Sequence, residues 1–362
     1  MKVAIPRAYL GTMTFAWSSQ TSSVVDEPVA IEMVHRFIKF QQELGVDSYR
    51  IDTARVYAGG NTEPMVGAVL KKLDPAWNAS TKTNILVGTK AHPSVKPGGL
   101  SPSGIQDQLS TSLDAMELDS VEEYYLHQPD TEHSLLDSLK YAHSLVEQGK
   151  IKTIGMSNYH ASEMARAFAL CKEHNLTPPR VYQGLYNPLN RLVEVELLPI
   201  LNDNGCSFVA YNPLAAGLLT GKHLTPDSVS PGRFKNNENY LPRFYTSSNF
   251  EAIKLIRTQC EVDGISMVEA TYRWLLCHSA LSPDKDGFLL GASSLEQLDQ
   301  NLAACLAAAT KEKLSPAMLS AFDRAWELTK DGAFPYWRSY SSDMPNREAL
   351  DPGASYNAAK AK

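Results

Sequence analysis

The sequence lacks the features of several common protein classes. Among its 362 residues, no apolar stretch approaches the roughly 18 residues that a membrane helix needs. The opening Met1–Pro6 is too short and too polar for a secretory signal. The 34 lysines and arginines are dispersed among 40 acidic residues, so no basic stripe indicates nucleic acid or a lipid surface. We therefore expect no nucleic-acid partner and no membrane partner.

Cysteine is scarce and widely spaced. The five cysteines, at positions 171, 206, 260, 277 and 305, are odd in number and form no CxxC pair. Zinc sites and thioredoxin-like redox motifs usually need such pairs, so we predict no metal centre. Reduced, mostly buried thiols in a cytoplasmic protein are the simplest interpretation.

Most familiar catalytic and nucleotide-binding motifs are also absent. No GxGxxG supports a Rossmann dinucleotide site, and neither HExxH nor GxSxG occurs. Gly217–Lys222 resembles a P-loop only superficially, because its glycines are four apart and His223 stands where a serine or threonine should follow the lysine. Glycoside hydrolysis would need two carboxylates at strand ends, and only Asp52 is obvious.

Eight short runs rich in β-branched and aromatic residues predict strands, and each ends in polar or glycine-bearing sequence. Helical patterns lie between them; in Ile31–Phe40, for example, apolar residues recur every three to four positions. Strict alternation of strand and helix predicts parallel strands, and eight of them with helices outside favour a barrel. The predicted strands are Ala8–Leu10, Tyr49–Ile51, Ile85–Val87, Glu123–Leu126, Thr153–Gly155, Val181–Gln183, Ser207–Ala210 and Gly287–Leu290.

Further helices are predicted along the chain from the same periodicity. Ser101 and Pro102 supply a cap and a first-turn proline for the helix that runs to Leu118. The other predicted helices are Leu135–Val146, Ser162–Leu170, Val193–Leu201, and two near Phe250–Cys260 and Met267–Leu276.

The alternation is interrupted once, by about 75 residues between the seventh and eighth strands. Residues 217–248, rich in Pro, Gly, Asn and Arg, are predicted to lie over the mouth of the barrel as a lid. We assign residues 1–340 to a single α/β domain, a (β/α)₈ TIM barrel with this lid insertion. Residues 341–362 are expected to form a flexible C-terminal tail, because the sequence from Asp351 onward looks frayed.

Four polar residues follow the second, third and fourth predicted strands. Asp52, Lys90 and His127 stand about 38 residues apart, and Tyr57 comes five residues after Asp52. In a parallel barrel the carboxyl ends of the strands share one mouth, so these side chains should meet there. Each alone has an ordinary structural explanation: a helix cap, a loop aromatic, a surface lysine or a structural histidine. Their combination at successive strand ends favours an enzyme site.

This set of side chains can deliver a proton. The pKa of a free tyrosine is near 10, too high for an efficient donor at neutral pH, and a nearby ammonium lowers it by stabilising the phenolate. Asp52 would keep Lys90 charged and aimed at Tyr57, while His127 would orient a substrate carbonyl. Such a step suits carbonyl reduction. Because tyrosine brings no hydride, a nicotinamide must bind.

At these residues the chain resembles the aldo-keto reductases, most closely their aflatoxin-aldehyde-reductase branch. The resemblance runs in order from about residue 8 to residue 310. The matching segments are Leu10–Met13, Ile51–Tyr57, Gly88–Lys90, Tyr125–Asp130, Ile154–Tyr159, Tyr182–Asn187, Tyr211–Lys222 and Gly291–Asn301.

The resemblance implies an enzyme that binds NADPH without a Rossmann fold and reduces aldehydes or ketones to alcohols. It assigns Tyr57 as the acid, Lys90 and Asp52 as its tuning pair, and His127 as the residue that orients the substrate. A homodimer is the assembly that it implies.

The resemblance also implies the cofactor contacts. Ser157, Asn158 and Gln183 would hold the nicotinamide carboxamide, and Tyr211 would stack on the ring. The remaining contacts are Asn212, Pro213, Leu214, Ala216, Gly217, Leu219 and Gly221 around the pyrophosphate, and Gly291, Ser293, Ser294, Gln297 and Asn301 at the adenosine end, near the start of a helix.

Two departures from the family pattern concern the cofactor. No Lys or Arg stands in the Gly291 segment for a 2′-phosphate, but the branch uses lid arginines, which Arg233 and Arg243 match. NADPH is therefore the expected cofactor. Ala216 also replaces a common glycine, at little expected cost.

The substrate residues implied by the branch are a lid tyrosine and a C-terminal arginine, which Tyr240 and Arg338 match. Such an arginine would suit carboxylated aldehydes such as succinic semialdehyde. A surface salt bridge is an equal alternative for Arg338.

Two other functions remain open from the sequence. Potassium-channel β subunits share this barrel and cofactor site and act mainly as nicotinamide-sensing partners, but they typically carry a Trp where Tyr159 follows Asn158. Steroid double-bond reduction usually goes with a glutamate in place of the histidine, and His127 argues against it.

Overall fold

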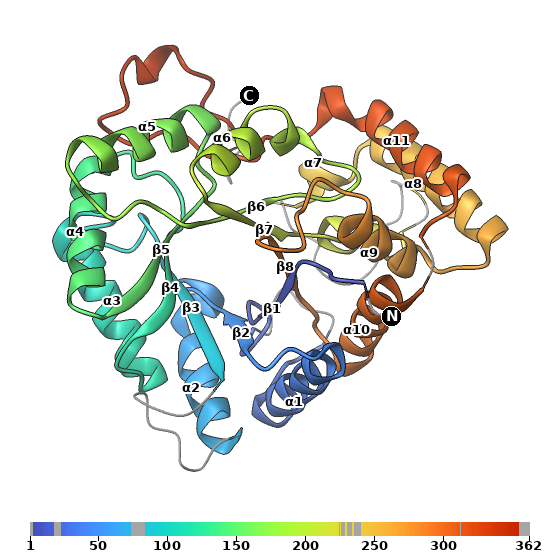
Figure 1. Ribbon diagram of the computed structural model, residues 1–362, viewed down its shortest axis with the longest axis horizontal. Coiled ribbons are helices and arrows are strands. Elements are labelled where there is room, and N and C mark those ends of the chain that lie inside the picture. The colour runs from blue at the N-terminus through green and yellow to red at the C-terminus, as the bar shows by residue number, and fades with distance from the viewer. Residues whose placement is uncertain are drawn as a thin grey trace.

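Eight parallel strands close into a barrel in this structure, a computed structural model (Figure 1). It describes residues 3–17, 23–73, 84–223, 225, 229, 234, 240–311 and 313–354. The strands pair in chain order and β8 pairs with β1, so the predicted barrel is confirmed. They are β1 Arg7–Gly11, β2 Tyr49–Asp52, β3 Ile85–Ala91, β4 Val121–Leu126, β5 Ile151–Ser157, β6 Val181–Leu185, β7 Ser207–Tyr211 and β8 Gly287–Leu290.

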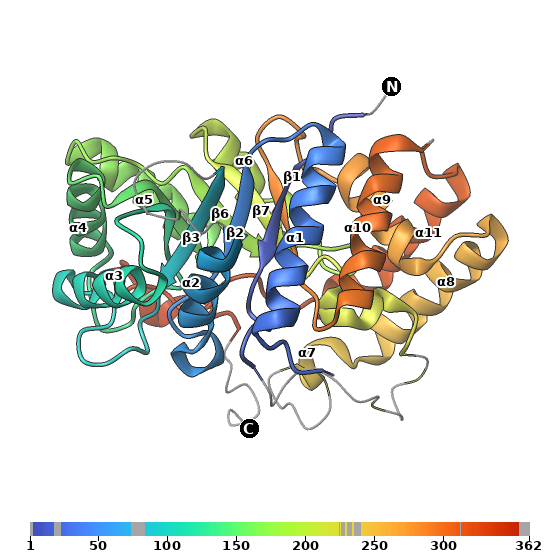
Figure 2. The same ribbon diagram turned by 90° about the horizontal axis from the view of Figure 1, so that it is seen from below.

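Helices surround the barrel, and α8 and α11 lie beyond α9 and α10 at one side of the ring (Figures 1 and 2). The helices are α1 Glu27–Leu44, α2 Thr62–Leu73, α3 Pro102–Met116, α4 Leu135–Glu147, α5 Ala161–Glu173, α6 Leu197–Asp203, α7 Leu241–Phe244, α8 Ser247–Asp263, α9 Met267–Cys277, α10 Leu295–Thr310 and α11 Pro316–Thr329. Short 3₁₀ turns occupy Tyr57–Gly60, Leu192–Glu194, Ala215–Thr220, Lys330–Gly332 and Arg347–Ala349.

Most helices begin where the sequence predicts. The Ser101 hydroxyl accepts a hydrogen bond from the Gly104 N–H, which confirms the predicted cap of α3. The helix predicted over Val193–Leu201 is instead split into a 3₁₀ turn and α6. Pro199 explains the split, because a proline ring clashes with the carbonyl one turn before it and cannot continue a longer helix. Helix α11, which the sequence analysis did not predict, packs on α8.

Glycines make room for large side chains inside the barrel. A Cβ atom added at Gly155 would lie 2.3 Å from the Tyr125 ring, and one at Gly88 would lie 3.3 Å from Glu123 Cβ. Tyr9, Tyr125, Val181, Val209 and Leu289 form a buried cluster in the barrel interior. The interior is therefore a packed floor, above which the strand ends support a pocket.

Described residues of the lid, residues 217–248, lie at one end of the barrel. Figure 2 places α7 there, below the strands. Phe234 and Tyr245 pack with ring centroids 4.9 Å apart, and the Tyr245 hydroxyl lies 2.6 Å from His223 Nδ1. Aromatic contacts within the lid thus hold its described residues together.

Residues 341–354, assigned from the sequence to the tail, make specific contacts with the barrel helices. The Ser341 N–H donates to Glu163 of α5, and Asp343 accepts hydrogen bonds from Arg166 and from the Leu135 N–H of α4. Residues 355–362 lie outside the described part of the chain. Within that part, no helix is long and apolar enough to cross a membrane.

Candidate active site

A buried ion pair forms the base of the site. Lys90 is fully buried in β3, and its Nζ donates to both carboxylate oxygens of Asp52, at 2.6 and 2.7 Å, and to the Thr53 carbonyl. Gln183 Nε2 in β6 donates to Asp52 Oδ1 at 2.9 Å. Burial lowers the pKa of Lys90, and the Asp52 carboxylate opposes that shift. Lys90 is therefore a barrel-interior group and not a surface lysine.

Tyr57 lies above this ion pair on the loop that follows β2. The loop is fixed to β3, because the Thr53 and Arg55 N–H groups donate to carbonyls of that strand. Lys90 Nζ lies 5.2 Å from the centroid of the Tyr57 ring. The strand-end ammonium, carboxylate and phenol predicted from the sequence are thus neighbours.

Two histidine rings lie next to Tyr57 at the cavity. The His127 ring meets the Tyr57 ring edge to face at 5.9 Å and the His92 ring at 5.0 Å. Burial holds the pKa of His127 well below its usual range, with His92, Lys90 and Arg338 adding to the shift. Burial and then Arg338 lower the pKa of His92 to about 4. Both imidazoles are therefore neutral near pH 7, and each keeps one N–H donor.

Asn158 ties two sides of the mouth together. It adopts a left-handed backbone conformation with φ of +62°, which asparagine tolerates better than most residues. Its Nδ2 donates to the His127 carbonyl and to Ser157 Oγ, and its Oδ1 accepts from the Tyr211 hydroxyl at 2.8 Å. The positions of His127 and Tyr211 are thus coupled through one amide.

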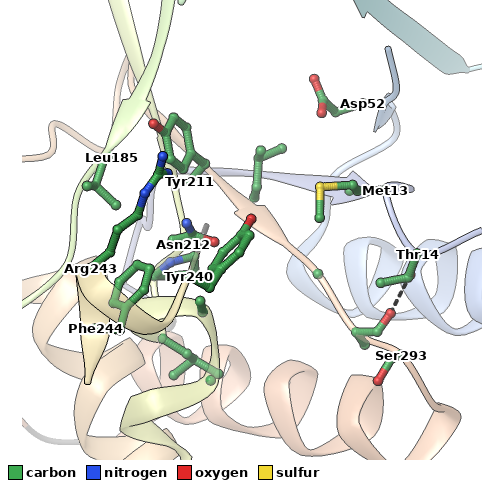
Figure 3. A pocket seen from close by; sticks show the side chains of 18 of the residues that line it. Met13, Thr14, Asp52, Leu185, Tyr211, Asn212, Tyr240, Arg243, Phe244 and Ser293 are labelled. Atoms are coloured by element: carbon green, nitrogen blue, oxygen red, sulfur yellow. Dashed lines mark hydrogen bonds between the residues drawn. The ribbon is translucent and has the colours of Figure 1, made fainter. Parts of the chain in front are cut away.

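These groups open into a cavity of about 510 Å³. In Figure 3, Tyr240, Arg243 and Phe244 of the lid lie near Tyr211 and Asn212, with Ser293 across the cavity. The predicted site residues that line it are Asp52, Tyr57, His127, Ser157, Asn158, Gln183, Tyr211, Asn212, Pro213, Leu214, Ala216, Gly217, Tyr240, Arg243, Gly291, Ser293, Gln297, Asn301 and Arg338.

A few predicted residues do not line the cavity. Lys90 and Leu219 are buried beneath its surface, and Gly221 lies beside it. Ser294 instead caps α10, its hydroxyl accepting from the Gln297 N–H. Arg233 lies outside the described residues.

Several lining residues were not predicted from the sequence, and two of them, His92 and Lys222, carry titratable groups. His92 comes directly after β3, so the strand-end rule used for Asp52 and His127 could have found it. Lys222 ends the Tyr211–Lys222 segment that resembles the family, but the residues assigned to the pyrophosphate stopped at Gly221. Trp17, Phe234 and Phe334 gave no comparable signal, because they come from loops far apart in the chain.

The segment after β7 forms a tight curl beside the cavity. Ala215, Ala216 and Gly217 have φ values of +49°, +57° and +106°. At Ala216 this left-handed conformation costs about 1 kcal/mol relative to glycine. The Ala215 and Gly217 N–H groups already donate to the Asn212 and Leu214 carbonyls, which holds the curl in place. The N-terminus of α10, at the same cavity, is a place where an anion is favoured.

Arg338 belongs to the C-terminal segment, and its side chain lines the cavity. Its N–H donates to the Asn158 carbonyl, and its Nη1 donates to Gln128 Oε1 at 3.3 Å. The residue is 9% exposed, so Arg338 does not lie at the surface. Arg338 therefore presents a largely buried guanidinium near His92 and His127.

The fold and site together are those of a barrel oxidoreductase. The model of the aldo/keto reductase family matches residues 8–325, and this chain belongs to that family, an oxidoreductase family that uses nicotinamide cofactors.

Several curated relatives cover most of the chain. It is 39% identical over 300 residues to aflatoxin B1 aldehyde reductase member 2 of Mus musculus, covering 80% of this chain and 79% of the relative. It is 38% identical over 299 residues to aldo-keto reductase family 7 member A3 of Homo sapiens, covering 80% and 87%. Oxidoreductase sirO of Leptosphaeria maculans is 31% identical over 346 residues, covering 91% and 97%.

Proposed function

We propose that this chain reduces aldehydes, and some ketones, to alcohols with NADPH as the hydride donor and Tyr57 as the proton donor. The observation that carries the proposal is the Asp52–Lys90 pair buried directly beneath Tyr57 at the cavity. The names of the relatives, two of them reductases of aldehydes or aldo-keto substrates, support the substrate class.

The hydrogen-bonding capacity of the cavity fits a nicotinamide. Ser157 Oγ accepts from Asn158, which leaves its own hydrogen to donate, and Gln183 donates to Asp52, which leaves its Oε1 to accept. A carboxamide needs one donor and one acceptor, so these two side chains match it. Tyr211, held by Asn158, would stack on the ring. The bound cofactor would supply the hydride.

Charged groups favour the phosphates of such a cofactor. Lys222 and Arg243 line the cavity, and the start of α10 adds backbone donors. Lys222 and Arg243 support NADPH over NADH, because NADPH carries an additional 2′-phosphate whose negative charge these cations would attract.

The proton step follows from the geometry. The Lys90 ammonium, kept charged by Asp52, stabilises the phenolate that Tyr57 becomes when it protonates the substrate oxygen. A neutral His127 donates its N–H to the same carbonyl oxygen and selects its orientation. Burial of the ion pair excludes water, so these charges act at low dielectric.

The test is NADPH oxidation with a panel of small aldehydes. Tyr57→Phe should lower kcat by about 100-fold or more while the Kd for NADPH changes little, because only the proton donor is lost. Tyr49→Phe, on the outer side of the barrel, is the matched control and should keep wild-type kcat.

Wild-type kcat in Tyr57→Phe would refute the assignment. Turnover below about 0.01 per second for every aldehyde would instead favour a nicotinamide-sensing binding subunit, since ordinary enzymes turn over at about 1 to 10³ per second.

A further inference from the structure

A second pair of opposite charges lies in the barrel interior beneath the Asp52–Lys90 pair. Arg50 lies two residues before Asp52 in β2, and Glu123 lies two residues before Tyr125 in β4. Because side chains alternate along a strand, Arg50 and Glu123 also face the barrel interior. Arg50 Nη1 donates to Glu123 Oε1 at 2.8 Å, and the Glu123 side chain is 7% exposed. Two ion pairs are thus stacked along the same wall of the barrel.

Glu123 is surrounded by donors. The Tyr9 hydroxyl donates to its Oε1 at 3.0 Å, and the Tyr125 hydroxyl donates to its Oε2 at 2.7 Å. Burial raises the pKa of Glu123, and the opposing effects of Arg50 and the two phenols reduce this rise without cancelling it. A guanidinium, which can only donate, together with two phenols stabilises the carboxylate form of this side chain. The absence of a side chain at Gly88 leaves the space that Glu123 fills.

The second pair is coupled to the first through Tyr125. Lys90 Nζ lies 5.5 Å from the centroid of the Tyr125 ring and 5.2 Å from that of Tyr57. The ammonium therefore lies between two phenols, of which the upper faces the cavity and the lower is hydrogen bonded to Glu123. Because Glu123 and Lys90 are both buried, a charge at Glu123 acts on Lys90 with little screening by solvent.

We propose that Glu123 and Arg50 are positioning residues that set the pH range over which Tyr57 holds the proton it donates. The inference rests on the proposed reductase function and deepens it. The charged and titratable groups around this pair are Arg7 and Tyr9 of β1, Asp52 of β2, Lys90 of β3, Glu122 and Tyr125 of β4 and Glu63 of α2, and Lys152 of β5 pairs with Glu122.

The sign follows from the charges. An ionised Glu123 disfavours a second negative charge nearby, so it keeps Tyr57 protonated to higher pH, and Arg50 has the opposite effect. Reduction needs the protonated phenol, so activity falls as pH rises and phenolate forms. Removing the charge of Glu123 should move that fall to lower pH, and removing the charge of Arg50 should move it to higher pH.

The experiment compares pH profiles of kcat/KM for aldehyde reduction in the full chain. The basic limb of the profile, where activity falls as pH rises, should move down by about 0.5 to 1 pH unit in Glu123→Gln and up by a similar amount in Arg50→Gln. A shift of this size is expected for one charge acting across a side-chain layer at an effective dielectric constant of about 20. The double variant should return close to wild type, because it removes both charges. A merely structural role would not give opposite shifts.

Glu122→Gln is the matched control. It removes the same charge from the adjacent residue of β4, whose carboxylate lies 3.8 Å from Arg50 instead of 2.8 Å and is also paired with Lys152. The basic limb of its pH profile should move less than that of Glu123→Gln. An unshifted limb in Glu123→Gln, or an equal shift in Glu122→Gln, would overturn the inference. If Glu123→Gln does not fold, Arg50→Gln decides, and a limb that stays or moves down would overturn it.

A second readout separates this inference from the proposed function. The ultraviolet absorbance of the Tyr57 phenolate, taken as the difference between each protein and its Tyr57→Phe counterpart, can be titrated without substrate. If wild type reduces no aldehyde, the proposed function fails, and this titration still tests the inference. Titration midpoints that coincide in wild type and Glu123→Gln would refute it whatever the activity.

Discussion

The pH dependence of stability should report on one buried carboxyl group, Glu163. This residue is fully buried in the first turn of α5, where its Oε1 accepts from the Ser341 N–H. Burial raises the pKa of Glu163 from 4.5 to about 7, with Asp343 adding to the shift and Ser341 and Arg166 opposing it. The folded protein therefore binds a proton at Glu163 more tightly than the unfolded chain does.

The sign and size of the effect follow from this shift. The stability associated with the proton is fully present below about pH 4.5 and is lost as pH rises toward 7. At about 1.4 kcal/mol per pKa unit, wild type should lose about 2.5 kcal/mol between pH 5 and pH 8 relative to a variant without this carboxyl.

Glu163→Gln is that variant, because its amide oxygen can still accept from Ser341. Urea unfolding at intervals from pH 5 to pH 8 should show the free energy of unfolding of Glu163→Gln rising relative to wild type by the stated amount. Glu173→Gln, at the exposed end of the same helix, is the control and should run parallel to wild type. A difference between Glu163→Gln and wild type that does not vary with pH would refute the reasoning.

Two further predictions concern the substrate end and the barrel floor. Arg338→Met should lower kcat/KM for succinic semialdehyde by about 10- to 100-fold, which is the contribution of a charge-assisted hydrogen bond. The same substitution should change kcat/KM for butanal little, because butanal has no carboxylate. Equal losses for both aldehydes in steady-state assays would contradict a carboxylate-binding role. Gly155→Ala should destabilise the protein by about 3 kcal/mol in thermal or urea unfolding, because the added Cβ would lie 2.3 Å from the Tyr125 ring. Gly332→Ala is the control and should be neutral, because its Cβ would meet nothing within 4 Å. Similar effects of the two substitutions would refute the packing argument.

The barrel could be predicted because each strand is a short apolar run that ends in polar or glycine-bearing sequence. That pattern located all eight strands, and the strand-end rule brought Asp52, Lys90 and His127 together. Helix α11 was missed although Ser315 and Pro316 supply its cap, because it follows the last strand and adds no unit to the alternation.

Contacts that depend on register across strands could not be predicted. The bond from Gln183 to Asp52 joins β6 to β2 across the barrel interior, and nothing in either segment specifies it. Arg50 and Glu123 are charged residues inside strands, where a charge more often faces water. Their inward orientation follows only once Asp52 and Tyr125 are known to face inward, since side chains alternate along a strand.

The origin of Arg338 has a consequence for how the protein is made. Asp52, Tyr57, Lys90 and His127 are all translated before residue 130, and β8 closes the barrel at Leu290. The arginine that completes the cavity leaves the ribosome dozens of residues later, and its segment then docks across α4 and α5 through Ser341 and Asp343. A nascent chain thus acquires every strand and every α-helix of the barrel before it acquires Arg338, so a chain that ended between Thr329 and Arg338 would lack only the C-terminal segment and the guanidinium that we propose selects carboxylated aldehydes.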